Sequence, residues 1–231
     1  MSKSRGLFIT GTDTEVGKTY VTAMIARQLH EEGHSVGVYK PAASGCHKEF
    51  GTLISPDAVA LWDAAGNHGQ LQYVCPQLFR APLAPHLAAR AEGKELDEQL
   101  LIDGIDYWTN NSEIVLVEGA GGLMSPMGDD LYVADLADQF GFLLIVVTKN
   151  VLGTINQTIQ TLITAATFRD GLDIAGIVLN QISPPQNDDP SAASNRRELA
   201  NRCVPPLLAG VSWQATRFDG DVNWFELAGR R

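Results

Sequence analysis

Apolar runs alternate with helix-period segments along this chain of 231 residues. The apolar runs predict strands at Gly6–Thr10, Ser35–Lys40, Ile114–Val117, Leu143–Val147, Ile174–Leu179 and, as a short last strand, within Pro206–Val211. Runs that are apolar at nearly every position are typical of parallel strands whose two faces are both covered. The pattern therefore predicts a parallel sheet buried between layers of helices.

Helices are expected between these strands. Val21, Met24, Ile25 and Leu29 recur at spacings of three and four in a helix that begins near Gly17, and a second periodic segment follows the fourth strand. No fixed repeat length and no shift in composition divides the chain. We therefore expect residues 1–231 to form a single doubly wound α/β domain with a mainly parallel sheet. The polar stretch at 183–194 (SPPQNDDPSAAS) is expected to be an exposed, mobile loop.

The charge balance narrows the possible partners. The chain has 17 Lys and Arg against 27 Asp and Glu, a formal net charge of −10. Binding to nucleic acid or to anionic lipid usually needs a basic surface, so neither is expected. No CxxC pair exists, and no apolar stretch approaches the roughly 20 residues of a membrane helix. We expect a cytoplasmic protein that binds any anion at a local positive site.

The stretch Ile9–Thr19, ITGTDTEVGKT, lies between a predicted strand and a predicted helix. This is the setting of the phosphate-binding loop (P-loop) of nucleoside triphosphatases, where backbone N–H groups at a helix start hold phosphates. Lys18 would reach the β- and γ-phosphates, and the hydroxyl of Thr19 would bind Mg²⁺. The front of the loop is irregular, because the pattern GxxxxGK[ST] places its first glycine at position 12 and the chain has Gly11. The alternative is a tight turn with a solvated lysine.

Three further residues extend this candidate site. Glu118 follows a predicted strand in the sequence IVLVEGAGG, where nucleoside triphosphatases usually carry a metal-binding Asp. Lys40 ends another predicted strand, and ligands of open α/β sheets collect at the carboxyl ends of strands. A second cation there could stabilise a transferring phosphoryl group. Asp57, in Ser-Pro-Asp, fits the first turn of a capped helix, so a metal role for it needs other support. Each of the three can also be read as a solvated surface residue.

Five motifs, in this order, resemble those of the dethiobiotin synthetase family: GTDTEVGKT, YKPAASG, SPDAVAL, VEGAGG and LGTINQT. They run from Gly11 to about Asn180, and the lengthened loop is itself the form found in that family. The resemblance implies a P-loop enzyme of biotin synthesis that uses Mg²⁺ and ATP. Its substrates would be 7,8-diaminononanoate and CO₂ or bicarbonate. A carbamate forms on one amine, ATP phosphorylates it to a carbamic-phosphoric anhydride, and the second amine closes the ureido ring, releasing ADP and phosphate.

The resemblance also assigns residues. Nucleotide contacts are implied for Gly11, Thr12, Asp13, Thr14, Glu15, Val16, Gly17, Lys18, Thr19, Asn180 and Ser212. Metal ligands are implied at Thr19, Asp57 and Glu118. Substrate contacts are implied for Thr14, Lys40, Ser44, Gly121 and Asn156, the last from the second subunit of a homodimer. Lys18, Lys40 and Thr14 are the expected catalytic residues, because this chemistry needs mainly positioning and neutralisation of charge.

The sequence departs from the family at two matched positions. Ser212-Trp213 replaces the usual Pro and its following residue, which leaves the strictness of the preference for ATP open. Gln157 stands where the family often has His, away from the chemistry. The segment from 212 onward resembles nothing that we can place. Two other functions remain open: a related ATP-dependent amidoligase of cofactor synthesis, and a nucleotide-switched P-loop ATPase without a small-molecule reaction.

Overall fold

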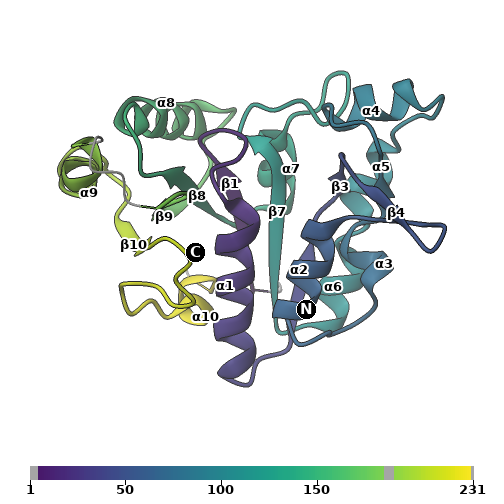
Figure 1. Ribbon diagram of the computed structural model, residues 1–231, viewed down its shortest axis with the longest axis horizontal. Helices are drawn as coiled ribbons and strands as arrows, with labels where there is room; N and C mark the ends of the chain where they lie inside the picture. Colours follow the sequence, from purple (N-terminus) through teal and green to yellow (C-terminus); the bar gives the residue numbers. More distant parts are fainter. Residues whose placement is uncertain (1–4, 185–189, 230–231) are drawn as a thin grey trace.

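The six apolar runs form one sheet in the computed structural model, which describes residues 5–184 and 190–229 (Figure 1). Its strands are β1 (Arg5–Gly11), β2 (Val36–Tyr39), β7 (Ile114–Gly122), β8 (Leu143–Lys149), β9 (Ile174–Asn180) and β10 (Leu207–Val211). They lie in the order β10-β9-β8-β1-β7-β2, and each neighbouring pair is parallel. All six predicted strands and the parallel sheet are confirmed.

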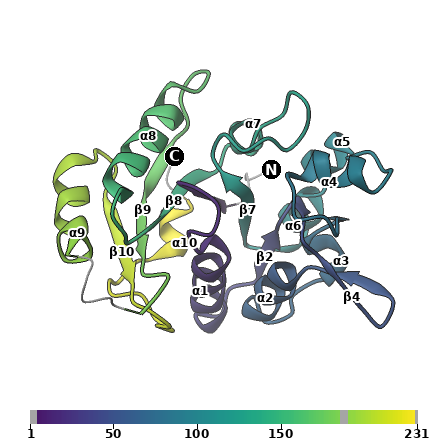
Figure 2. The same cartoon turned by 45° about the horizontal axis from the view of Figure 1, so that its top comes forward.

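Helices cover both faces of this sheet. They are α1 (Lys18–Glu31), α2 (Pro56–Ala64), α3 (Leu71–Val74), α4 (Pro85–Ala91), α5 (Glu98–Asp103), α6 (Asp106–Asn111), α7 (Val133–Phe140), α8 (Thr154–Thr167), α9 (Ser191–Arg202) and α10 (Trp224–Leu227). The step from β1 to β2 runs one way along the sheet, and the steps from β7 through β8 and β9 to β10 run the other way. Right-handed crossovers therefore place α1 on one face and α7, α8 and α9 on the other. Figure 2 shows α1 below the sheet and α7 and α8 above it. The predicted doubly wound α/β domain is confirmed.

The central strands are buried along their whole apolar length. Leu7, Phe8 and Ile9 of β1 are fully inaccessible to solvent, and so are Val115 and Leu116 of β7. Burial of consecutive residues means that both faces of the strand are covered, as the continuous apolar runs predicted. Two small sheets flank the main one: β3 (Ala42–Ala43) pairs with β6 (Gln77–Leu78), and β4 (His47–Glu49) pairs with β5 (Thr52–Ile54).

Strand β7 is longer than predicted. It continues past Val117 to Gly122, so Glu118 lies within the strand and not after its end. Glu118 is opposite Ile9, and Gly122 is opposite Gly11, with an irregularity in register between these pairs. The carboxyl ends of parallel strands lie at one edge of a sheet. Glu118 is therefore carried to the edge at which the chain leaves β1.

The stretch at 183–194 is only partly the loop that was expected. Ser191 already begins α9, so the loop is shorter at its C-terminal end, and residues 185–189 lie outside the described part of the chain. The Ser and Ala residues from 191 onward continue into a helical segment that reaches Arg202. The expected mobility of the rest of the stretch stays a prediction.

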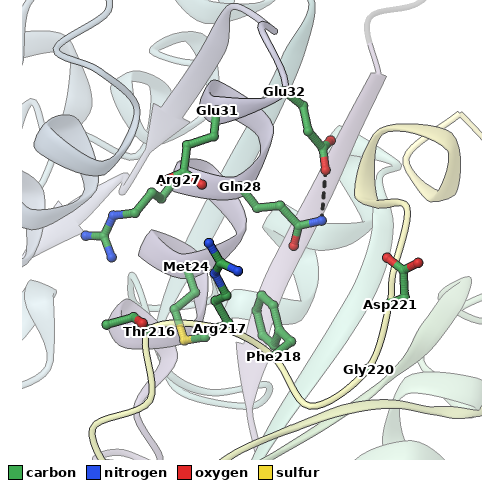
Figure 3. Close-up of a pocket in the computed structure, with 10 residues that line it drawn as sticks. All are labelled: Met24, Arg27, Gln28, Glu31, Glu32, Thr216, Arg217, Phe218, Gly220 and Asp221. Atoms are coloured by element: carbon green, nitrogen blue, oxygen red, sulfur yellow. Dashed lines mark hydrogen bonds between the residues drawn. The ribbon is translucent and has the colours of Figure 1, made fainter.

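The segment after β10 packs along α1. Trp224 is fully buried, and its indole Nε1 donates to Gln28 Oε1 at 3.0 Å. Nearer the phosphate loop, the hydroxyl of Tyr20 donates to the carbonyl of Ala215 at 2.7 Å. A pocket of about 460 Å³ lies between α1 and residues 216–221 (Figure 3). The C-terminal segment thus supports the helix that begins at the phosphate loop. Within the described ranges, no helix is both long and apolar enough to cross a membrane.

Candidate active site

Two glycines fix the shape of the phosphate loop between β1 and α1. Gly17 is the N-cap of α1 with φ +85°, and a Cβ built on it would lie 2.1 Å from Asn180 Nδ2. A Cβ on Gly11 would lie 2.7 Å from Val16 Cγ2. Glycine is required at position 17 by its left-handed backbone and at both positions by the close approach of these atoms. The loop is therefore tightly wound at both ends, and the N–H groups at the start of α1 make its C-terminal end a suitable anion site.

Lys18 lies in the first turn of α1 and is buried. Its Nζ donates to the backbone carbonyl of Asp13 at 3.2 Å, within the same loop. Burial lowers the pKa of Lys18 from its ordinary value, although the carboxylates of Glu118 and Asp57 act in the opposite direction. Within residues 5–184 and 190–229, the ammonium is thus held beside the loop by a single neutral acceptor. A phosphate oxygen could replace that acceptor and would offer it a full negative charge.

Lys40 lies between two carboxylates. Its Nζ is 2.5 Å from Asp57 Oδ2 and 2.7 Å from Glu118 Oε1. Burial by itself would lower the pKa of Lys40, but the two carboxylates outweigh it and hold the pKa well above its ordinary value. Lys40 is therefore a permanently charged ammonium and not a base at neutral pH. The sequence placed Lys40 at this edge of the sheet but did not predict that it pairs with both carboxylates among the expected metal ligands.

Asp57 lies in the first turn of a capped helix, as the sequence suggested, and its metal role stays a prediction. Ser55 caps α2, its side chain accepting from the N–H of Ala58 at 3.2 Å, and Pro56 is the first helical residue. The capped-helix interpretation is confirmed. The same cap aims the first turn of α2 at the phosphate loop, so that the Asp57 side chain reaches Lys40. It remains 49% exposed, which leaves its carboxylate accessible to a ligand.

Thr19, Asp57 and Glu118 were expected to hold Mg²⁺. The hydroxyl of Thr19 donates to Glu118 Oε1 at 2.8 Å, and Glu118 is 1% exposed. The other carboxylate oxygen, Glu118 Oε2, is buried and has no hydrogen-bond partner in the part of the chain that the structure describes. A buried carboxylate oxygen without a donor is costly unless a cation meets it. Mg²⁺ prefers hard oxygen ligands and usually takes only one or two carboxylates from a protein, so these residues fit it.

One cavity of about 440 Å³ brings most of the predicted residues together. Its lining includes Thr14, Glu15, Gly17, Lys18, Thr19, Lys40, Ser44, Asp57, Glu118 and Gly121. Four lining residues were not predicted: Ala42, Ala43, Gly119 and Ala120. Their small size was visible in the motifs PAASG and EGAGG, and it keeps the wall between the charged groups open. The cavity therefore joins the phosphate loop to the ends of β2 and β7.

Four predicted residues of the phosphate loop, Gly11, Thr12, Asp13 and Val16, do not line this cavity, and three other predicted residues lie apart from it. Asn180 lies behind the loop, where its Nδ2 donates to the carbonyl of Val16 at 3.0 Å. Ser212 lines a separate hollow of about 290 Å³, which also includes Trp213 and Asn150. Asn156 is exposed in the first turn of α8. The first two flank the loop on the side away from Lys40, whereas Asn156 does not line the cavity of its own chain.

The chain matches the AAA domain family across residues 5–216. It is 42% identical to the ATP-dependent dethiobiotin synthetase BioD of Rhodopirellula baltica over 215 residues, which cover 88% of this chain and 82% of the relative. The protein of the same name from Anaeromyxobacter dehalogenans is 41% identical, with 91% of each chain covered. That from Anoxybacillus flavithermus is 39% identical, with 95% and 97% covered.

Among solved structures, the signal recognition particle receptor FtsY from Elizabethkingia anophelis is similar to this chain with a TM-score of 0.60. The match covers 99% of this chain but 65% of that one, at 13% identity. Chloroplast FtsY from Physcomitrella patens gives a TM-score of 0.55 at 14% identity. At such low identity the likeness shows a shared fold alone.

Proposed function

The chain belongs to the AAA domain family and to the family of ATP-dependent dethiobiotin synthetases, and from this premise we propose that it converts 7,8-diaminononanoate, CO₂ and ATP into dethiobiotin, ADP and phosphate. One observation carries the proposal: Lys18, Lys40, Asp57 and Glu118 line the same cavity, directly beside the phosphate loop. Phosphoryl transfer needs such convergence of cations and metal-binding carboxylates, because the protein contributes mainly position and charge.

The reaction has three steps. One amine bonds to CO₂ and loses a proton, which gives a carbamate. A carbamate oxygen then bonds to the γ-phosphorus while the bond from that phosphorus to ADP breaks. Finally the second amine bonds to the carbamate carbon, phosphate leaves, and the amine gives up a proton as the ring closes. Negative charge crowds together in the second step, so this is the step at which fixed cations contribute most.

The two lysines have different tasks in this proposal. Lys18, at the loop, holds the β- and γ-phosphates. Lys40 faces the cavity from the end of β2 and stabilises the carbamate and the transferring phosphoryl group. Its raised pKa means that it keeps its proton throughout and acts as a fixed charge. Thr19, Asp57 and Glu118 would hold Mg²⁺, which when bound would neutralise negative charge on the phosphates of ATP.

The diamine would bind at the end of the cavity that is formed by Thr14, Ser44 and Gly121. We propose that Asn156 reaches the carboxylate tail of a diamine bound to the other subunit of a homodimer. Its exposure in the first turn of α8 supports this role, because the side chain is accessible to another chain.

We propose that adenine lies in the hollow that contains Ser212 and Trp213, on the other side of Asn180 from the cavity. The indole of Trp213 offers a face for stacking. Asn180 lies between Leu179 and Gln181 of the lining and donates to the carbonyl of Val16 in the phosphate loop. Three free thiols, Cys46, Cys75 and Cys203, support a reducing compartment, and we propose that the protein works in the cytoplasm.

The test is to follow ADP release from Mg-ATP and ¹³C-labelled bicarbonate, with and without 7,8-diaminononanoate. We expect ADP only with the diamine, together with a product that carries the label in its ureido carbonyl. Equal ADP release without the diamine would favour a nucleotide-switched ATPase. Release only with another amine or acid would favour a related amidoligase, and the proposed reaction would be wrong.

A further inference from the structure

Threonine hydroxyls from three separate segments meet at the carboxyl end of β8. Thr148 of β8 is 3.3 Å from the hydroxyl of Thr12 in the phosphate loop, 2.7 Å from that of Thr154 and 3.0 Å from that of Thr158, both in α8. Thr148, Thr154 and Thr158 are fully buried. Thr148 thus contacts both the loop and the first two turns of α8.

Counting donors fixes the direction of these hydrogen bonds. A threonine hydroxyl has one proton to donate and two lone pairs that accept. Thr12 and Thr158 both donate to Thr148, which uses both of its lone pairs. The proton of Thr148 is then donated to Thr154. The Thr148 hydroxyl is saturated, so removing it takes from the other three hydroxyls a hydrogen bond that none of them replaces among the described residues.

The other threonines of α8 behave differently. Thr161, Thr164 and Thr167 donate to the carbonyl four residues earlier in their own helix. That is the usual local bond of a helical threonine and contributes nothing between segments. Thr154 and Thr158 lie four residues apart on the same face of α8, and both are turned toward β8. The cluster therefore connects segments, beyond stabilising one helix.

The threonine cluster is connected to Lys18 through Thr12 and Asp13 of the phosphate loop. The N–H of Thr12 donates to the carbonyl of Val147 at 3.0 Å, so Thr12 is held to the end of β8 by its backbone as well as its side chain. The next carbonyl along the loop, that of Asp13, accepts a hydrogen bond from the Lys18 ammonium. Any shift of Thr12 would therefore move the group that holds Lys18.

We propose that Thr148 is a positioning residue for the phosphate loop, and that its hydroxyl fixes Thr12 so that Lys18 is aimed at the nucleotide phosphates. This rests on the proposed binding of ATP at the loop, and does not depend on which acceptor the phosphoryl group reaches. Thr148 touches neither the cavity nor the reacting atoms. Its effect should appear in the binding of ATP and not in that of the diamine.

The test compares Thr148→Val, which keeps the shape but removes the hydroxyl, with Thr148→Ser, which keeps the hydroxyl. Thr161→Val is the matched control, because it removes a buried hydroxyl of α8 that bonds only within the helix. Calorimetric titration of the whole protein with Mg-ATP, without the diamine, gives the affinity. Thr148→Val should weaken it about tenfold, the size expected from one lost hydrogen bond, with KM for ATP rising alike and KM for the diamine unchanged. Thr148→Ser and Thr161→Val should stay within about twofold of the unsubstituted protein.

Equal affinities for Thr148→Val and Thr161→Val, or a serine variant as weak as the valine variant, would overturn the positioning role. If Thr148→Val does not fold, Thr158→Val removes only one donor and should still weaken ATP binding about threefold. No weakening there would overturn the role as well. An unsubstituted protein that binds Mg-ATP but forms no dethiobiotin would instead contradict the proposed reaction and leave this comparison valid.

Discussion

Replacing Lys40 by Met tests the centre of the proposed site. The change keeps most of the length of the side chain and removes its charge. Glu118, 1% exposed, would then lose the ammonium at 2.7 Å and keep only the Thr19 hydroxyl. Removing one partner of a buried ion pair costs about 3–5 kcal/mol, because the other charge stays buried. Asp57 is half exposed, so the loss of its contact adds little. The free energy of unfolding should fall by about 3–5 kcal/mol, as measured by denaturant titration.

The same substitution should slow the reaction without emptying the nucleotide site. Loss of one preorganised group that stabilises a charged transition state typically lowers kcat by about 10²–10³. Lys18 and the loop are unchanged in Lys40→Met, so KM for ATP should change by less than about tenfold. Mg-ADP should recover part of the lost stability, because the metal brings positive charge back to Glu118. Steady-state ADP release and thermal unfolding with and without Mg-ADP measure these effects.

Lys149→Met is the matched control, since Lys149 also ends a strand of the sheet but does not line the cavity. It should leave both kcat and the unfolding free energy close to those of the unsubstituted protein. A Lys40→Met protein whose KM for ATP rises while kcat at saturation is unchanged would refute the role assigned to Lys40. It would mean that Lys40 only binds the nucleotide.

Three further predictions concern the loop and its support. Gly17→Ala puts a Cβ 2.1 Å from the Asn180 amide at φ +85°, so it should cost at least ~1–2 kcal/mol of stability and weaken Mg-ATP binding more than tenfold by calorimetry. Trp224→Phe leaves Gln28 Oε1 without its indole donor, and the free energy of unfolding from urea titration should fall by about 1–2 kcal/mol. Burial would raise the pKa of Asp219, but an ion pair with a neighbouring arginine and a backbone N–H hold it below its ordinary value. The carboxylate therefore contributes stability above the unfolded pKa of about 4 and loses it as pH falls further, so Asp219→Asn should flatten the acid limb of stability against pH.

The sequence predicted the sheet well because its signal is local. Continuous apolar runs such as Ile114–Val117 are read within a few residues, and burial of both strand faces is what they require. The same reading ended this strand too early, because Glu118 and the glycines after it are polar or small and yet continue the pairing with β1. Strand order was not predicted, since the pattern of one strand does not identify its neighbours.

Most residues that line the cavity were predicted individually, but the contacts between their side chains were not. Lys40 follows β2, Glu118 lies in the C-terminal part of β7 and Asp57 lies in the first turn of α2, and parallel strands bring such positions to one edge. That Lys40 reaches both carboxylates depends on the register of β2 against β7 and on the angle at which α2 leaves its cap. The hydroxyl cluster around Thr148 was missed for the same reason, since nothing in a lone threonine indicates a partner as far along the chain as Thr12.

The balance of charge in the cavity supports the proposed use of a metal. Lys18 and Lys40 contribute two positive charges to its lining, whereas Glu15, Asp57 and Glu118 contribute three negative ones, so the ionisable lining sums to −1. The whole chain, at −10, adds no attraction for a polyphosphate. Two features can still draw ATP in: the N–H groups at the start of α1, and a cation that arrives with the nucleotide. The buried, unpartnered oxygen of Glu118 is where such a cation would gain most. Until it arrives, Lys40 supplies the positive charge that keeps Glu118 in place.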